Sequence, residues 1–108
     1  MPYDQELDLR LGAAINGWGT VRKMAFGGTC HLLNGNMLCG VHKDRLILRL
    51  GPRAAEQAMS RPHVKPFDIT GKPMKGWIMV ALEGIDKDRD LEKYVTLAES
   101  FVKTLPRK

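Results

Sequence analysis

Lysine, tryptophan and glycine gather in one stretch of the chain, Phe67-Asp-Ile-Thr-Gly-Lys-Pro-Met-Lys-Gly-Trp77. This stretch fits neither a helical nor a strand period, so we predict a shaped loop that presents Lys72 and Lys75. Cations beside an indole suit an anion, a nucleic acid or an acidic protein surface. The first predicted strand adds two further cations, Arg22 and Lys23. The candidate binding residues are therefore Arg22, Lys23, Lys72, Lys75 and Trp77. In the structural alternative, the glycines and Pro73 form a turn, Trp77 packs into the core and the lysines are solvated.

Catalytic residues are not found in the sequence. Nucleophilic catalysis needs a serine, cysteine or lysine beside a base, but Ser60 and Ser100 have no nucleophile elbow or nearby histidine pattern. His63 lies between two prolines, which favours an exposed loop. The run Thr70-Gly-Lys72 is not a phosphate-binding loop, because Pro73 replaces the serine or threonine that would bind magnesium. We therefore expect no catalytic residue and no cofactor, and a protein that is not an enzyme.

Two amphipathic helices are predicted at the ends of the chain. In residues 4–17 the apolar positions recur every three or four residues, and Asn16-Gly17 supplies a left-handed stop. The last helix has the same period from Leu91 to Leu105, with acids clustered at its start. A short helix is expected after Pro52. The predicted strands are residues 21–26, 29–33, 37–41, 45–50, 64–69 and 77–82.

The hairpin turns predict how the central strands pair. A two-residue turn at Asn34-Gly35 would pair position 33 with 36, 32 with 37 and 30 with 39. A turn around Lys43-Asp44 would pair 41 with 46 and 39 with 48. The two hairpins together would place one continuous apolar surface on a single face of an antiparallel sheet, formed by Cys30, Leu32, Met37, Cys39, Val41, Leu46, Leu48 and Leu50.

The opposite face of this predicted sheet is also rich in apolar side chains. It would hold His31, Leu33, Leu38, Gly40, Ile47 and Arg49. Such a face needs a cover, which a second subunit would provide in a homodimer and which another segment of the same chain would provide in a monomer.

The two cysteines are predicted to be buried thiols. The hairpin register places Cys30 opposite Cys39, where a cross-strand disulfide is geometrically conceivable, but a cytosolic location keeps thiols reduced. Their spacing is not that of zinc ligands, and strand alternation points His31 away from Cys30, so we expect no metal site.

Length and charge describe a single basic domain. A chain of 108 residues suits one compact core, so we predict one domain over residues 1–108. The net charge is +5, and residues 20–76 alone carry ten Lys and Arg against three acids, a net charge of +7. This excess favours an acidic partner protein or nucleic acid. No apolar run is long enough to span a membrane, and the polar, acidic N-terminus is unlike a secretory signal, so we expect a cytoplasmic protein.

Several motifs resemble one known family. They are Lys23-Met-Ala-Phe-Gly-Gly28, Asn34-Gly-Asn-Met37, Cys39-Gly-Val41, Arg49-Leu-Gly-Pro52 and the run from Phe67 to Trp77. In this order the chain is similar to the TfoX N-terminal domain family, with Ala25 as a departure, since the family usually runs Met-Phe-Gly-Gly there. The resemblance implies an α+β fold, with N- and C-terminal helices packed on an antiparallel β-sheet in two layers. It also implies a role in regulation, because full-length TfoX or Sxy proteins activate competence genes together with the cyclic-AMP receptor protein and carry a second, C-terminal domain.

The leading hypothesis is a non-enzymatic cytoplasmic interaction domain, linked to transcriptional regulation, that uses a basic surface. One alternative is a protein that binds a small molecule or anion in a pocket under the 70–77 loop. The other is direct nucleic-acid binding, for which the chain has few aromatic residues and no recognisable helix-turn-helix.

Overall fold

The structure, a computed structural model, describes residues 3–25, 28–68 and 74–107. Its sheet has six strands in the order β1-β2-β3-β4-β6-β5, and every neighbouring pair is antiparallel. The strands are β1 (Val21–Ala25), β2 (Gly28–Leu33), β3 (Asn36–His42), β4 (Arg45–Arg49), β5 (Val64–Pro66) and β6 (Trp77–Ala81). The helices are α1 (Gln5–Ala14), α2 (Pro52–Ala58), the 3₁₀ turn η1 (Leu82–Ile85) and α3 (Asp88–Val102).

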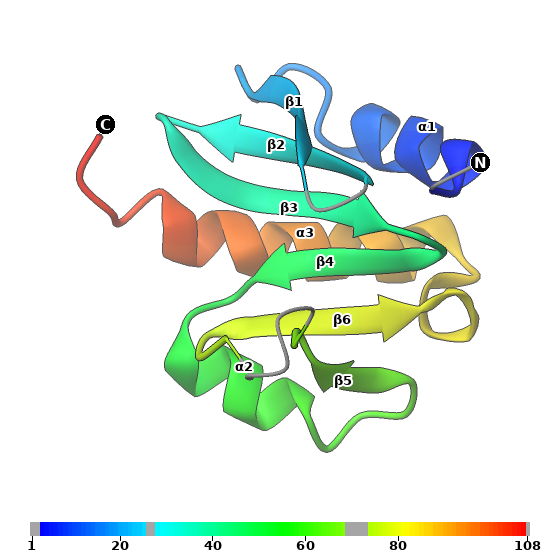
Figure 1. Cartoon of the computed structure of the whole chain (residues 1–108). Coiled ribbons are helices and arrows are strands. Elements are labelled where there is room, and N and C mark those ends of the chain that lie inside the picture. The colour runs from blue at the N-terminus through cyan, green and yellow to red at the C-terminus, as the bar shows by residue number, and fades with distance from the viewer. Residues whose placement is uncertain (1–2, 26–27, 69–73, 108) are drawn as a thin grey trace.

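The helices confirm the predicted two-layer α+β architecture. Figure 1 shows α3 running behind the sheet, with α1 beside it at the β1 and β2 end. The apolar stripes of both helices are buried against the strands, because leucines 7 and 11 of α1 and five residues of α3 belong to the main core. The face of the sheet that α1 and α3 cover is called the helix face below, and the opposite one the open face.

Local chemistry explains where α1 begins and ends. The Asp4 side chain accepts a hydrogen bond of 3.0 Å from the Leu7 N–H and so caps the first turn. The helix ends at Ala14, three residues before the predicted end, and Gly17 follows with a φ of 87°. The predicted left-handed residue is therefore present, but the chain leaves the helix before reaching it.

Both predicted hairpin turns are present. Asn34 and Gly35 have φ angles of 54° and 81°, as a two-residue turn between right-twisted strands requires, and residues 33 and 36 pair across it. In the second hairpin, Val41 pairs with Leu46 and Cys39 with Leu48, as predicted.

The pairing of Cys30 with Cys39 is wrong. The register between β2 and β3 shifts between His31 and Leu32, so Cys30 lies opposite Gly40 and His31 lies opposite Cys39. At this point β3 has one residue more than β2. The side chains on the two sides of the extra residue therefore lie on opposite faces of the sheet, where the prediction had placed them on one face. Cys39, Val41, Leu46 and Leu48 therefore face the helices, whereas Met37 packs on the open face. Both cysteines are buried free thiols, as expected.

Part of the apolar open face is covered by the same chain. Phe67 and Trp77, the ends of a connection between β5 and β6, form a small buried cluster with Ile47. Half-buried methionines 37, 74 and 79 pack around this cluster. Intrachain packing therefore provides the cover here, and the homodimer stays a prediction.

Candidate functional site

Arg22 and Lys23 are neighbours on the edge strand β1 but have opposite surroundings. The Arg22 guanidinium lies 2.8 Å from the Asp8 carboxylate of α1, so Arg22 is on the helix-face side. Lys23 is the next residue and therefore points to the other side, where it is exposed. The two cations do not act on one surface.

Lys75 and Trp77 lie near the start of β6, and Lys72 lies outside the described residues. Trp77 is only 8% exposed and packs on Phe67, with ring centroids 5.7 Å apart, so its indole belongs to the core of the open face. Lys75 is exposed. Because four strand-to-strand steps separate β1 from β6, Arg22 and Trp77 are about 19 Å apart at the usual strand spacing. The structure thus does not bring the predicted basic residues into one site.

The strands reveal a different basic surface. None of the six described strands contains an acidic residue. One row across the sheet runs from Lys23 through Cys30, Gly40, Ile47 and Met79 to Lys65, and paired residues share a face. Arg45, two residues before Ile47, is on the same side. We call Lys23, Arg45 and Lys65 the basic open face.

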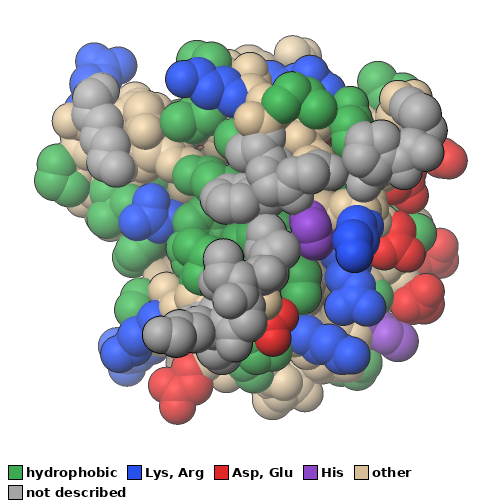
Figure 2. Space-filling model, viewed as in Figure 1, with side chains coloured by type: hydrophobic (Ala, Val, Ile, Leu, Met, Phe, Trp, Pro, Cys, Tyr) green, Lys and Arg blue, Asp and Glu red, His purple; other side chains and the backbone are tan. Residues whose placement is uncertain are grey.

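Acidic residues gather in the helical layer instead. They lie in and around α1 and in the segment from η1 to α3, namely Asp4, Glu6, Asp8, Glu83, Asp86, Asp88, Asp90, Glu92 and Glu99. In Figure 2, which looks onto the open face, hydrophobic side chains gather near the middle, Lys and Arg side chains lie around them, and most of the Asp and Glu side chains in view lie along the right margin. The described strands therefore carry cations without acids, whereas the helical layer carries a small net negative charge, since its nine acids exceed the six cations of residues 3–18 and 82–107.

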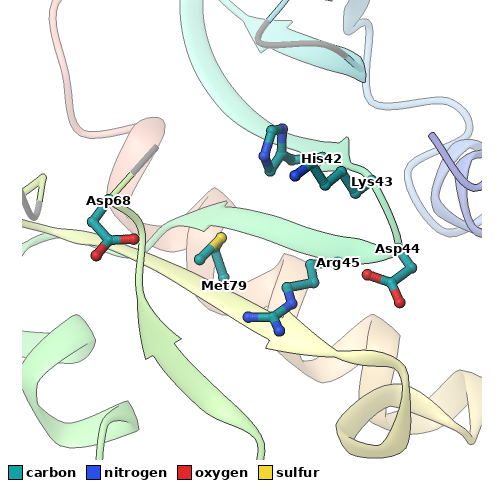
Figure 3. A pocket seen from close by; sticks show the side chains of 6 residues that line it. All are labelled: His42, Lys43, Asp44, Arg45, Asp68 and Met79. Carbon is teal, nitrogen blue, oxygen red and sulfur yellow. The ribbon is translucent and has the colours of Figure 1, made fainter. Parts of the chain in front are cut away.

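A pocket of about 350 Å³ opens at the edge of the basic open face. Figure 3 shows its six side chains coming from the β3–β4 hairpin, from β6 and from the residue after Phe67. They are His42, Lys43, Asp44, Arg45, Asp68 and Met79. The pocket adjoins the connection that begins at Phe67, and its two cations, Lys43 and Arg45, are matched by the two carboxylates of Asp44 and Asp68.

A third polar arrangement lies between α1 and the first two strands. Asp8 accepts hydrogen bonds from Thr29 Oγ1 at 2.7 Å and from Arg22 Nη2 at 2.8 Å. Burial raises the pKa of Asp8, but these hydrogen bonds and the Arg22 charge outweigh it and hold that pKa below its ordinary value. Burial lowers the pKa of His31, and the nearby Asp8 charge only partly offsets this. The imidazole is therefore neutral at pH 7.

Sequence reasoning treated His31 only as a possible metal ligand and a sheet-face residue and did not pair it with Asp8, and it counted Arg45 and Lys65 only in the overall charge. Strand alternation could have placed Lys23, Arg45 and Lys65 together, but only with the correct strand order. In the part of the chain that the structure describes, no three His, Cys, Asp or Glu residues are grouped as metal ligands.

Comparison with known proteins identifies a family for this chain. The model described as the TfoX N-terminal domain matches residues 14–102, which span most of the chain. Searches of curated proteins and of solved structures give no match. Over the described residues, the helices are too short or too polar to cross a membrane.

Proposed function

Because the chain belongs to the TfoX N-terminal domain family, we propose that it is a non-enzymatic cytoplasmic interaction domain that contributes to transcriptional regulation, as competence regulators do. The basic open face binds an acidic partner protein or nucleic acid. The observation that carries this proposal is the distribution of charge between the layers: the described strands contain cations and no acids, whereas nine acids lie in the helical layer and exceed its cations.

Two physical features support the open face as the contact surface. Like-signed cations spaced across a sheet attract an acidic surface before contact and speed its association. Met79 lies in the row between Lys23 and Lys65, and the half-buried Met37 and Met74 pack on the neighbouring cluster of the same face. Methionine adapts its shape to different partners because its side chain is unbranched and polarizable. A partner would thus meet apolar contacts beside the cations.

The test is affinity capture from a cell lysate with two charge-reversed variants. The first carries Lys23→Glu, Arg45→Glu and Lys65→Glu on the basic open face. The matched control carries the same change in charge on exposed cations of the helical layer, with Lys93→Glu, Lys103→Glu and Arg107→Glu. Eluates from the wild type and both variants are analysed by mass spectrometry and for nucleic acid, with and without nuclease treatment.

We expect transcription proteins or nucleic acid to be captured by the wild type and by the control, and lost by the open-face variant. Capture that survives nuclease identifies a protein partner, and capture that nuclease removes identifies direct nucleic-acid binding. If both variants retain the same partners as the wild type, the open face is not the contact surface.

A second candidate function is binding of a small molecule or anion in the 350 Å³ pocket at the β3–β4 hairpin. The observation that favours it is that His42, Lys43 and Arg45 line a pocket beside the connection that starts at Phe67. A ligand that binds only the folded state raises the melting temperature. A screen of small anions and metabolites would support this function if a hit stabilises the wild type but not Arg45→Gln.

A further inference from the structure

His31 carries a buried nitrogen without a hydrogen bond. The residue is 4% exposed, and within the described residues its Nε2 is the one buried side-chain nitrogen or oxygen that lacks a partner. The nearest acceptor, Asp8 Oδ1, is 3.6 Å away, too far for a hydrogen bond. Leaving a buried polar atom unpaired destabilises a fold, so such an atom calls for a specific explanation.

The His31 ring also lines a pocket of about 260 Å³ that lies between the end of α1 and the start of β1. The other residues that line this pocket are Gly12, Ile15, Asn16, Gly17, Gly19, Thr20 and Arg22. This pocket is distinct from the one at the β3–β4 hairpin and shares no residue with it.

The pocket is rich in hydrogen-bond donors. The N–H groups of Gly17, Gly19 and Thr20 donate no hydrogen bond to another described residue. Gly17 and Gly19 have φ angles of 87° and 77° and flank Trp18, whose N–H donates to the Ile15 carbonyl, so the glycine amides are the ones left for a ligand. Thr20 adds a hydroxyl and Asn16 an amide.

Arg22 contributes a cation, and one of its three nitrogens is available to donate to a ligand. Its Nε and Nη2 donate to Asp8, and Nη2 also contacts the Tyr3 hydroxyl at 3.3 Å. The remaining nitrogen, Nη1, has no described acceptor. Asp8 accepts from two of the three Arg22 nitrogens and from Thr29, so Nη1 is the Arg22 donor left for a ligand.

From this arrangement we propose that the pocket between residues 16–20, Arg22 and His31 binds a small oxyanion, a phosphate or carboxylate group. Binding is coupled to uptake of one proton from solvent by His31. The groups that face the imidazole are Asp8 on α1, Arg22 on β1 and the Cys39 thiol opposite it on β3. Asp8 favours the imidazolium and Arg22 opposes it, and a bound anion adds negative charge that favours it further. Protonated His31 then has a donor on each nitrogen.

The test is NMR titration of the intact chain with sodium phosphate in a buffer free of oxyanions. Sodium acetate provides the carboxylate arm, and sodium chloride at matched ionic strength is the control. We expect saturable shifts of the amides of Gly17, Gly19 and Thr20 and of the His31 ring. The anion that binds with the lower dissociation constant, phosphate or acetate, identifies the group that the site prefers. The apparent pKa of His31 should rise in the presence of the bound anion.

Variants separate this site from general attraction to cations. Arg22→Gln should weaken the binding about tenfold or more through loss of a charged hydrogen bond, whereas Lys103→Gln, which removes an exposed cation that lines neither pocket, should leave it unchanged. Since Arg22→Gln also breaks the contact with Asp8, Thr20→Val provides a second variant that removes only a hydroxyl and should weaken binding severalfold. Shifts that chloride reproduces, shifts that never saturate, or a His31 titration unchanged by both oxyanions would overturn the proposal.

Discussion

Phe67 and Trp77 pack against each other, with ring centroids 5.7 Å apart, at the two ends of the connection between β5 and β6. The Met74 N–H donates a 2.9 Å hydrogen bond to the Phe67 carbonyl, which further closes this connection. The most distinctive motif of the chain is thus fastened to the open face by its aromatic residues. Those aromatic residues stabilise the fold.

Truncation of Phe67 should therefore destabilise the whole domain. Its ring is fully buried against Trp77 and Ile47, and we expect Phe67→Ala to lower the free energy of unfolding by about 3–5 kcal/mol. Urea denaturation measures the change. Lys75→Ala, an exposed neighbour in the same motif, should change stability by less than about 0.5 kcal/mol. A mild effect of Phe67→Ala would mean that the connection is not anchored as described.

Two glycines with the same backbone conformation should respond differently to alanine. Gly17 and Gly51 both have a φ of 87°, but a Cβ at Gly17 meets nothing within 4 Å whereas one at Gly51 would lie 2.4 Å from the Phe101 ring. We expect Gly17→Ala to cost about 1–2 kcal/mol from the backbone alone. Gly51→Ala should cost a further 1–3 kcal/mol, roughly, because the ring must move. Equal losses in thermal or urea unfolding would contradict the packing of α3 against this turn.

Stability should fall as the pH drops below about 6.5, the ordinary pKa of histidine. Burial lowers the pKa of His31 in the folded state, so the unfolded chain binds more protons in this range and its population rises. The free energy of unfolding should decrease by at most about 1.4 kcal/mol per pH unit from this group. The depressed pKa of Asp8 acts in a separate, more acidic window, below about pH 4, where protonation of its carboxyl removes further stability.

Urea unfolding at about pH 7.5 and about pH 5.5, in buffer without phosphate, measures this effect. His31→Gln should flatten the dependence of the free energy of unfolding on pH. An unchanged slope in His31→Gln would show that the buried imidazole does not titrate as proposed.

Neither cysteine should react with thiol reagents in the native state. Cys30 and Cys39 are 5% and 0% exposed, and burial raises the pKa of both thiols. Since the thiolate is the reactive form, we expect modification only through unfolding, at a rate that urea accelerates for both residues. Oxidation should also yield no intramolecular disulfide, because Cys30 faces Gly40 and not Cys39. Rapid native-state labelling of either thiol would contradict this arrangement.

The fold could be predicted largely because its determinants are local. The periods of α1 and α3, the Asn34-Gly35 turn and the register beyond Lys43 each follow from a few neighbouring residues, and the structure confirms them. The extra residue in β3 has no comparable local cause. It moved Cys30 and Met37 to the face opposite the one predicted, since a shift of one residue reverses the alternation.

The candidate site could be predicted only in its overall charge. Which cations share a surface depends on the strand order. In this sheet β6 lies between β4 and β5, and the length of the connection between β5 and β6 does not reveal that order. Arg22 and Lys23 are adjacent in sequence but lie on opposite sides, while Lys23 and Lys65 share a row across the sheet. Likewise, Asp8 and His31 meet only because α1 packs on β1 and β2.

The most direct test of the central claim, that the basic open face binds an acidic partner, is an equilibrium affinity measurement. The partner recovered by capture is titrated against the wild type, the Lys23, Arg45 and Lys65 reversal, and the Lys93, Lys103 and Arg107 reversal. We predict that the first variant loses at least about a hundredfold in affinity, since each reversed charge that contacts the partner should cost roughly tenfold. The second variant should lose less than about threefold. The wild-type affinity should also fall with salt. Equal losses in the two variants, or a larger loss in the helical-layer variant, would contradict the claim.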